Sequence, residues 1–138
     1  MTGRAAEGRT APGFRRRVTA APEPLIGLRR ALATWLAGLG VRIEQQEDVV
    51  MASYEAMANS AEHAYRGRDP GELDVTATAG GDTITVVVTD YGRWLPPRST
   101  NGLRGRGLPL MRGLAHESKC VQRPDGTTVI LSWRREPA

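Results

Sequence analysis

The sequence contains one cysteine, Cys120, and no long apolar run. A lone cysteine excludes an internal disulfide framework and is typical of a reducing compartment. No apolar stretch approaches the ~20 residues that a membrane-spanning helix needs. The N-terminus also lacks an apolar core of signal-peptide length. We therefore expect a cytoplasmic protein that does not bind membranes, in which Cys120 is a packing residue rather than a nucleophile.

Aromatic residues are scarce, at 5% of the chain, although the net charge is +4. The arginines are dispersed, and the two obvious basic runs are residues 15–17 and 134–135. Neither run is interleaved with the aromatic side chains on which single-stranded nucleic acids stack. We expect no direct nucleic-acid binding, because attraction to an acidic protein or to nucleotide phosphates explains the charge equally well.

Composition and length favour a single globular unit. Hydrophobic residues make up 40% and charged residues 25% of the 138 residues, which is an ordinary globular balance. A chain of this length forms one domain with a real core. Residues 1–12 are rich in Gly, Ala, Arg and Thr without periodicity, so we expect a disordered N-terminal tail there. Residues 13–135 remain for the folded domain.

Two segments carry apolar residues at helical spacing. The first opens with Pro22 and Pro24, which suit the first turn of a helix, and ends at Gly38 or Gly40. The second spans residues 43–65. The predicted inward positions are Leu25, Leu28, Leu32, Trp35, Leu36 and Leu39 in the first helix and Val50, Tyr54, Met57, Ala61 and Ala64 in the second.

Strand patterns occupy most of the remaining sequence. We predict strands at residues 14–20, 72–79, 83–90, 117–122 and 127–133, and a short helix at residues 108–115. Turn signals at residues 80–82 and 124–126 predict two hairpins, and hence antiparallel pairing. The expected fold is an α/β (α+β) two-layer sandwich, with a mixed, mainly antiparallel sheet and helices packed on one face.

The second predicted helix carries Glu55, Asn59 and His63 four residues apart. This spacing places a carboxylate, an amide and an imidazole on one face of the helix. A general base one turn from a neutral oxygen donor can hold Mg²⁺ beside a phosphate-bearing substrate. A row of this kind is also common on a solvated helix face, so the segment alone leaves both interpretations open.

Three later motifs favour phosphate chemistry. An apolar β-branched run ends at Asp90 and Gly92, and so presents an aspartate at the mouth of a loop. Residues 101–111 are rich in glycine and run into an apolar helical pattern, an arrangement in which backbone N–H groups bind phosphate oxygens. Gly126 and Thr127 then form a turn that leads into a strand.

Taken in order, these motifs resemble the N, G1, G2 and terminal boxes of the GHKL ATP-binding superfamily, which includes gyrase, a heat-shock chaperone and histidine kinases. The form Glu-x-x-x-Asn-x-x-x-His-Ala-Tyr at residues 55–65 is most similar to the branch of anti-sigma factor serine/threonine-protein kinases. The resemblance covers roughly residues 14–134. It implies the Bergerat ATP-binding fold and makes residues 13–135 a histidine kinase-like ATP-binding domain.

The resemblance also implies roles for single residues. Glu55 would take the proton from the acceptor hydroxyl, and Asn59 would bind both ATP and Mg²⁺. Asp90 would accept a hydrogen bond from the adenine amino group, and Thr127 would support this end of the pocket through its hydroxyl. His63 would either touch the nucleotide or form a hydrogen bond within the fold, and the sequence leaves the two open.

The remaining implied ATP-binding positions belong to a glycine-rich lid. They are Gly92, Gly102, Arg104, Gly105, Arg106, Gly107 and Leu108. The glycines are either turn residues or bind phosphate, and their position after Asp90 favours a lid. The arginines add charge-assisted bonds to phosphate or are simply solvated. The chain departs from the family at Trp94, which replaces the second glycine of the G1 box.

The expected function is an ATP- and Mg²⁺-dependent serine/threonine kinase of the anti-sigma type. On this resemblance it phosphorylates a STAS-domain anti-sigma antagonist and sequesters a sigma factor, and homodimers are common in the family. The alternative is an ATP-binding regulatory module that transfers no phosphate. Glu55 favours the enzyme, whereas Trp94 favours the module. A complete histidine kinase is disfavoured, because no phosphoacceptor histidine lies on a dimerising helix.

Overall fold

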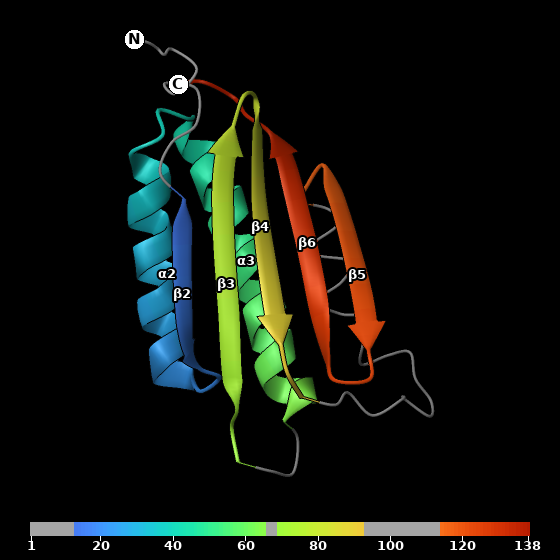
Figure 1. Cartoon of the computed structure of the whole chain (residues 1–138). Coiled ribbons are helices and arrows are strands. Elements are labelled where there is room, and N and C mark those ends of the chain that lie inside the picture. The colour runs from blue at the N-terminus through green and yellow to red at the C-terminus, as the bar shows by residue number, and fades with distance from the viewer. Residues whose placement is uncertain (1–12, 66–68, 93–113) are drawn as a thin grey trace, which may run out of the picture.

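Two helices cover one face of an antiparallel sheet in the computed structural model, which describes residues 13–65, 69–92 and 114–138 (Figure 1). Within these residues five strands are ordered β2-β3-β4-β6-β5, and every pairing is antiparallel. The elements are β2 (Phe14–Thr19), α2 (Pro22–Ala37), α3 (Ile43–Ala64), β3 (Glu72–Gly80), β4 (Thr83–Asp90), β5 (Glu117–Arg123) and β6 (Gly126–Arg134). The predicted two-layer sandwich is confirmed. Among the described residues no helix combines the length and apolarity needed to cross a bilayer.

Helix α2 begins where the prolines predict. Pro22 lies in the first turn, where a missing N–H costs no hydrogen bond, and the helix ends before Gly38. Four of the predicted inward residues are fully buried, namely Leu25, Leu28, Leu32 and Leu36. Trp35 and Leu39 are only half-buried and pack at the margin of the core. The apolar stripe of α2 is therefore narrower than the sequence predicts.

The buried stripe of helix α3 agrees only in part with the predicted inward side. Met57 and Ala64 are buried as expected, but the other buried positions are Gln45, Val49, Ala52, Ser53, Ala56 and Ser60. Val50 and Tyr54 are half-buried instead: Val50 lines a groove shared with α2, and the Tyr54 ring lies 5.0 Å from the Arg29 guanidinium. Val50, Tyr54 and Ala61 nevertheless pack against the core from its margin, so the predicted inward side is partly right, and what the sequence missed is the burial of small and polar positions such as Ser53 and Ser60.

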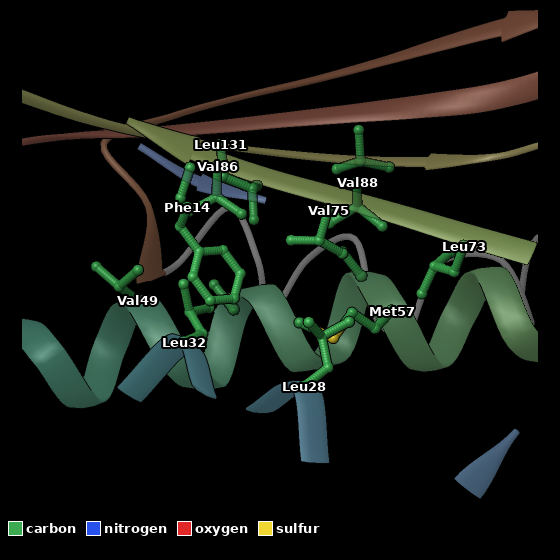
Figure 2. Packing of buried hydrophobic residues seen from close by; sticks show 14 of the residues in the cluster. Phe14, Leu28, Leu32, Val49, Met57, Leu73, Val75, Val86, Val88 and Leu131 are labelled. Atoms are coloured by element: carbon green, nitrogen blue, oxygen red, sulfur yellow. The ribbon is translucent and has the colours of Figure 1, made fainter. Parts of the chain in front are cut away.

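The sheet has one helix-facing side and one open side, since successive strand residues point to opposite faces. The helix-facing positions are buried along three strands: Leu73, Val75, Ala77 and Ala79 in β3, Ile84, Val86, Val88 and Asp90 in β4, and Val129, Leu131 and Trp133 in β6. Figure 2 shows residues of this set packed over Leu28 and Leu32 of α2 and Val49 and Met57 of α3. One continuous core thus joins both layers, with an aspartate at the end of its central strand.

Replacing Leu32 by alanine is expected to destabilise the fold by about 2–5 kcal/mol. Leu32 is completely buried between the helices and the sheet, so the truncation removes apolar contacts and leaves a cavity. The matched control is Ile26→Ala on the same helix, because Ile26 is 43% exposed. Urea denaturation followed by circular dichroism measures both free energies. Equal losses in the two variants would contradict this location of the core.

Candidate functional site

The end of β4, the start of β6 and the C-terminal end of α3 meet at one end of the sheet (Figure 1). Asp90 is the last residue of β4 and is completely buried. Its Oδ1 accepts hydrogen bonds from the backbone N–H groups of Thr127, at 3.1 Å, and Gly92, at 3.3 Å. Two backbone donors from separate segments therefore fix the direction of this carboxylate. Thr127 contacts the carboxylate through its backbone amide, and the role of its hydroxyl, which the resemblance implies, stays a prediction.

Glycines on both sides of Asp90 allow three backbone segments to approach closely. A Cβ added at Gly92 would overlap the backbone carbonyl of Ala64, in the last turn of α3. A Cβ added at Gly126 would overlap the carbonyl oxygen of Asp90 itself. Only glycine removes both overlaps without moving a strand or the helix. These two positions thus serve the packing around the carboxylate.

Tyr65 follows the last residue of α3 and is nearly buried, at 9% exposure. Its hydroxyl donates a hydrogen bond to the Glu72 carbonyl, at 2.7 Å, and accepts one from the Tyr91 N–H, at 3.0 Å. Burial raises the pKa of this hydroxyl above its ordinary value, so it stays protonated and can donate at neutral pH. Tyr65 therefore links α3 to both strands at the Asp90 end.

The row predicted from the sequence lies along α3. Glu55 and Asn59 are half-buried, and neither side chain makes a hydrogen bond or ion pair with another described residue. The His63 side chain is 12% exposed, and its Nε2 lies 4.0 Å from Oε1 of Glu62. A spacing of four residues keeps the three on one side of the helix. Ala64, next to His63, packs on Gly92, so the row leads toward the Asp90 end of the sheet.

Comparison with known proteins agrees with this arrangement. Residues 18–133 match the model of the histidine kinase-like ATPase domain family. The chain belongs to this family. Its membership confirms the resemblance seen in the ordered boxes, and ATP is accordingly the nucleotide expected of this ATPase domain.

Relatives of this histidine kinase-like ATPase domain carry kinase and anti-sigma names. The chain is 29% identical over 131 residues to the serine-protein kinase RsbW of Bacillus velezensis, covering 84% of this chain and 81% of the relative. It is 34% identical over 64 residues to the anti-sigma F factor of Clostridium beijerinckii, covering 46% and 45%. These names agree with the predicted anti-sigma kinase branch.

A solved structure shares the fold. The RsbU and RsbW domains of Rv1364c from Mycobacterium tuberculosis superpose with a TM-score of 0.76 at 27% identity. The match covers 93% of this chain and 34% of the other, so the chain spans about a third of that longer protein. The similarity therefore extends through nearly the whole ATPase domain and supports the two-layer architecture.

Several predicted positions of the ATPase domain lie outside the described residues. They are Gly102, Arg104, Gly105, Arg106, Gly107 and Leu108, together with Trp94, most of the predicted helix 108–115 and the predicted N-terminal tail. Their roles stay predictions.

Sequence reasoning assigned no role to Tyr65 and Ser60, which the structure brings to the site region. The Ser60 hydroxyl, one turn before Ala64, is buried and has no hydrogen-bond partner among the described residues, and the same holds for Ser53 two turns earlier. A buried hydroxyl of this kind is satisfied by a ligand or a bound water. The tyrosine ending the 55–65 motif was visible in the sequence, but its two backbone partners were not.

Proposed function

We propose that this chain is an ATP-dependent serine/threonine kinase of the anti-sigma type. It binds ATP and Mg²⁺ through the domain at residues 13–135, phosphorylates a hydroxyl of a STAS-domain anti-sigma antagonist, and sequesters a sigma factor. The observation that carries the proposal is the buried Asp90 carboxylate, oriented by the amides of Gly92 and Thr127. The names of the relatives support the kinase and anti-sigma parts. A homodimer also stays a prediction.

Adenine recognition is proposed for Asp90. A buried carboxylate that is held by backbone donors is rigid, and it accepts a hydrogen bond from the adenine amino group without reorganising. The orphaned hydroxyl of Ser60 fits a polar ligand or a water at this end of α3. The close packing at Gly92 keeps the backbone compact there. These features fit a rigid acceptor for the base at this end of the sheet.

The phosphate end is proposed for α3 and the glycine-rich segment. Asn59 would hold Mg²⁺ through its amide oxygen, and Glu55 would orient the acceptor hydroxyl and take its proton. Bound Mg²⁺ would neutralise charge on the phosphates, as in other phosphoryl-transfer sites. His63, Arg104 and Arg106 are proposed as further ATP contacts. Catalysis would then depend mainly on positioning and electrostatics.

The described residues fit a magnesium site of the phosphate-bridged kind. They contain no cluster of three or more His, Cys, Asp or Glu side chains that could hold a metal alone. Mg²⁺ in kinase sites usually keeps several waters and takes one or two protein ligands plus substrate phosphates. A single half-buried amide such as Asn59 is sufficient for that role. The metal would accordingly bind together with ATP.

A second candidate is a regulatory module that binds ATP and transfers no phosphate. Trp94 favours it, because a bulky residue replaces a glycine expected at the start of the lid. The two candidates share nucleotide binding and differ only in phosphoryl transfer. Binding and transfer must therefore be measured separately.

Calorimetric titration with ATP, with and without Mg²⁺, tests the shared step. Wild-type protein is expected to bind ATP in the presence of Mg²⁺, and Asn59→Ala is expected to weaken this binding about 10- to 100-fold. The control is Glu47→Ala, an exposed position on the same helix, which should bind as wild type does. Wild-type protein that binds no ATP would contradict the proposed function. Equal binding by Asn59→Ala would contradict the magnesium role alone.

A further inference from the structure

The hydroxyl of Tyr65 bridges β3 and β4 at the position where the next residue pair of their antiparallel ladder would lie. The last pair of this antiparallel ladder is Leu73 with Asp90, so Glu72 and Tyr91 would face each other in the next pair. The Tyr65 hydroxyl lies between the Glu72 carbonyl and the Tyr91 N–H and bonds to both. If the ladder continued by one pair, this carbonyl and this N–H would form a direct hydrogen bond. The side chain therefore spaces the two strands immediately beyond Asp90.

The ring of Tyr65 is held in this position by close packing. A Cβ added at Gly71 would overlap the Cε1 and Cζ atoms of the ring, so glycine is needed beside it. The Gly71 carbonyl in turn accepts a hydrogen bond from the Ala20 N–H, at 2.8 Å. Glu72, the hydroxyl's acceptor, pairs with Thr19 of β2. The hydroxyl is thus anchored to a part of the sheet that the edge strand keeps in place.

The bonds of Tyr65 act on the peptide that links Asp90 to Tyr91. The same short segment continues to Gly92, whose N–H donates to the Asp90 carboxylate. A shift of the Tyr91 N–H toward Glu72 would therefore move both the backbone of Asp90 and the Gly92 N–H, which is one of the described donors to its carboxylate. Phenylalanine would fill the core equally well, so packing of the ring does not explain why position 65 carries a hydroxyl.

We propose that Tyr65 is a positioning residue for adenine recognition. Its hydroxyl keeps the ends of β3 and β4 separated by the width of one bridging oxygen, and thereby sets the direction of the Asp90 carboxylate. The inference rests on the proposed function, since it takes Asp90 to be the group that reads the adenine amino group. Tyr65 itself need not touch the nucleotide. Its effect is expected only for ligands that carry this amino group.

The test compares ATP with purine riboside triphosphate, which lacks the 6-amino group, by calorimetry in Mg²⁺. Wild-type protein is expected to prefer ATP. Tyr65→Phe is expected to weaken ATP binding about five- to tenfold and to leave the affinity for the analogue unchanged. The ratio of the two affinities therefore falls by the same factor. Tyr54→Phe is the matched control, because Tyr54 lies within α3, about three turns before Tyr65, and contacts Arg29 instead of the strands. It should keep the wild-type preference.

A double-mutant cycle separates positioning from a general loss of structure. If Tyr65 acts through Asp90, Tyr65→Phe should have no further effect on ATP affinity in the Asp90→Asn background. Equal weakening of ATP and the analogue would overturn the inference, as would additive effects in the cycle. Wild-type protein that binds neither nucleotide would instead overturn the proposed function, and the inference with it. If Tyr65→Phe does not fold, Gly71→Ala displaces the ring and is expected to narrow the preference in the same way.

Discussion

Asp90→Asn is expected to lower the affinity for ATP about 100-fold. The substitution preserves shape but replaces one acceptor oxygen with an N–H₂ donor. If the amide nitrogen faces the amides of Thr127 and Gly92, donors oppose donors at contacts that now measure 3.1 and 3.3 Å. If it faces the adenine amino group, the same conflict arises at the ligand. Either orientation leaves buried donors without an acceptor.

The control for Asp90→Asn is a second buried carboxylate, on the open face of the sheet. Asp74 is 6% exposed and forms an ion pair with Arg15, whose Nη2 lies 3.0 Å from Oδ2. Asp74→Asn is expected to lower stability and to keep ATP affinity, because its partners are the side chains of Arg15 and, at 3.5 Å, Tyr91, on the side away from the helices, rather than the Tyr91 backbone. Calorimetry and thermal denaturation of both variants separate the two effects. Comparable losses of ATP affinity would contradict the adenine role of Asp90.

Most of the fold could be predicted because its signals are local. Alternating residues and glycine-containing turns predicted both hairpins, and Gly81 indeed adopts a positive φ of 61° between β3 and β4. Prolines predicted the start of α2. The stripe of α3 could not be predicted in the same way, because Ser53 and Ser60 look polar in the sequence and become buried only when the helix packs on the sheet.

The candidate site was predictable in its residue types but not in its geometry. The order of the boxes placed Asp90, Gly92 and Thr127 together in one expected pocket. The Asp90 carboxylate accepts from Gly92, two residues further on, and from Thr127 in a distant strand, and both donors are backbone amides, which have no signature in the sequence. Tyr65 shows the same limit, since both partners of its hydroxyl are main-chain atoms. Motifs therefore indicated which residues meet, and packing determines how they are held.

Glu55→Gln is expected to slow phosphoryl transfer about 10²- to 10⁴-fold while ATP binding changes little. Glu55 lies one turn before Asn59 on α3 and is only half-buried, so an incoming hydroxyl can reach it. Glutamine has nearly the same size but cannot accept a proton at neutral pH. The loss should accordingly appear in the transfer step, because the proton of the acceptor hydroxyl then has no base nearby.

The measurement is single-turnover transfer of labelled γ-phosphate from ATP to a STAS-domain antagonist, with ATP affinity determined in parallel. Glu47→Gln, an exposed position on the same helix, is the matched control and should transfer at the wild-type rate. A normal rate in Glu55→Gln would contradict the role of Glu55 as the base. Wild-type protein that binds ATP but transfers nothing would favour the regulatory module. Because both proposals require the Asp90 pocket and only the kinase requires Glu55, comparing the two variants separates recognition of ATP from its use.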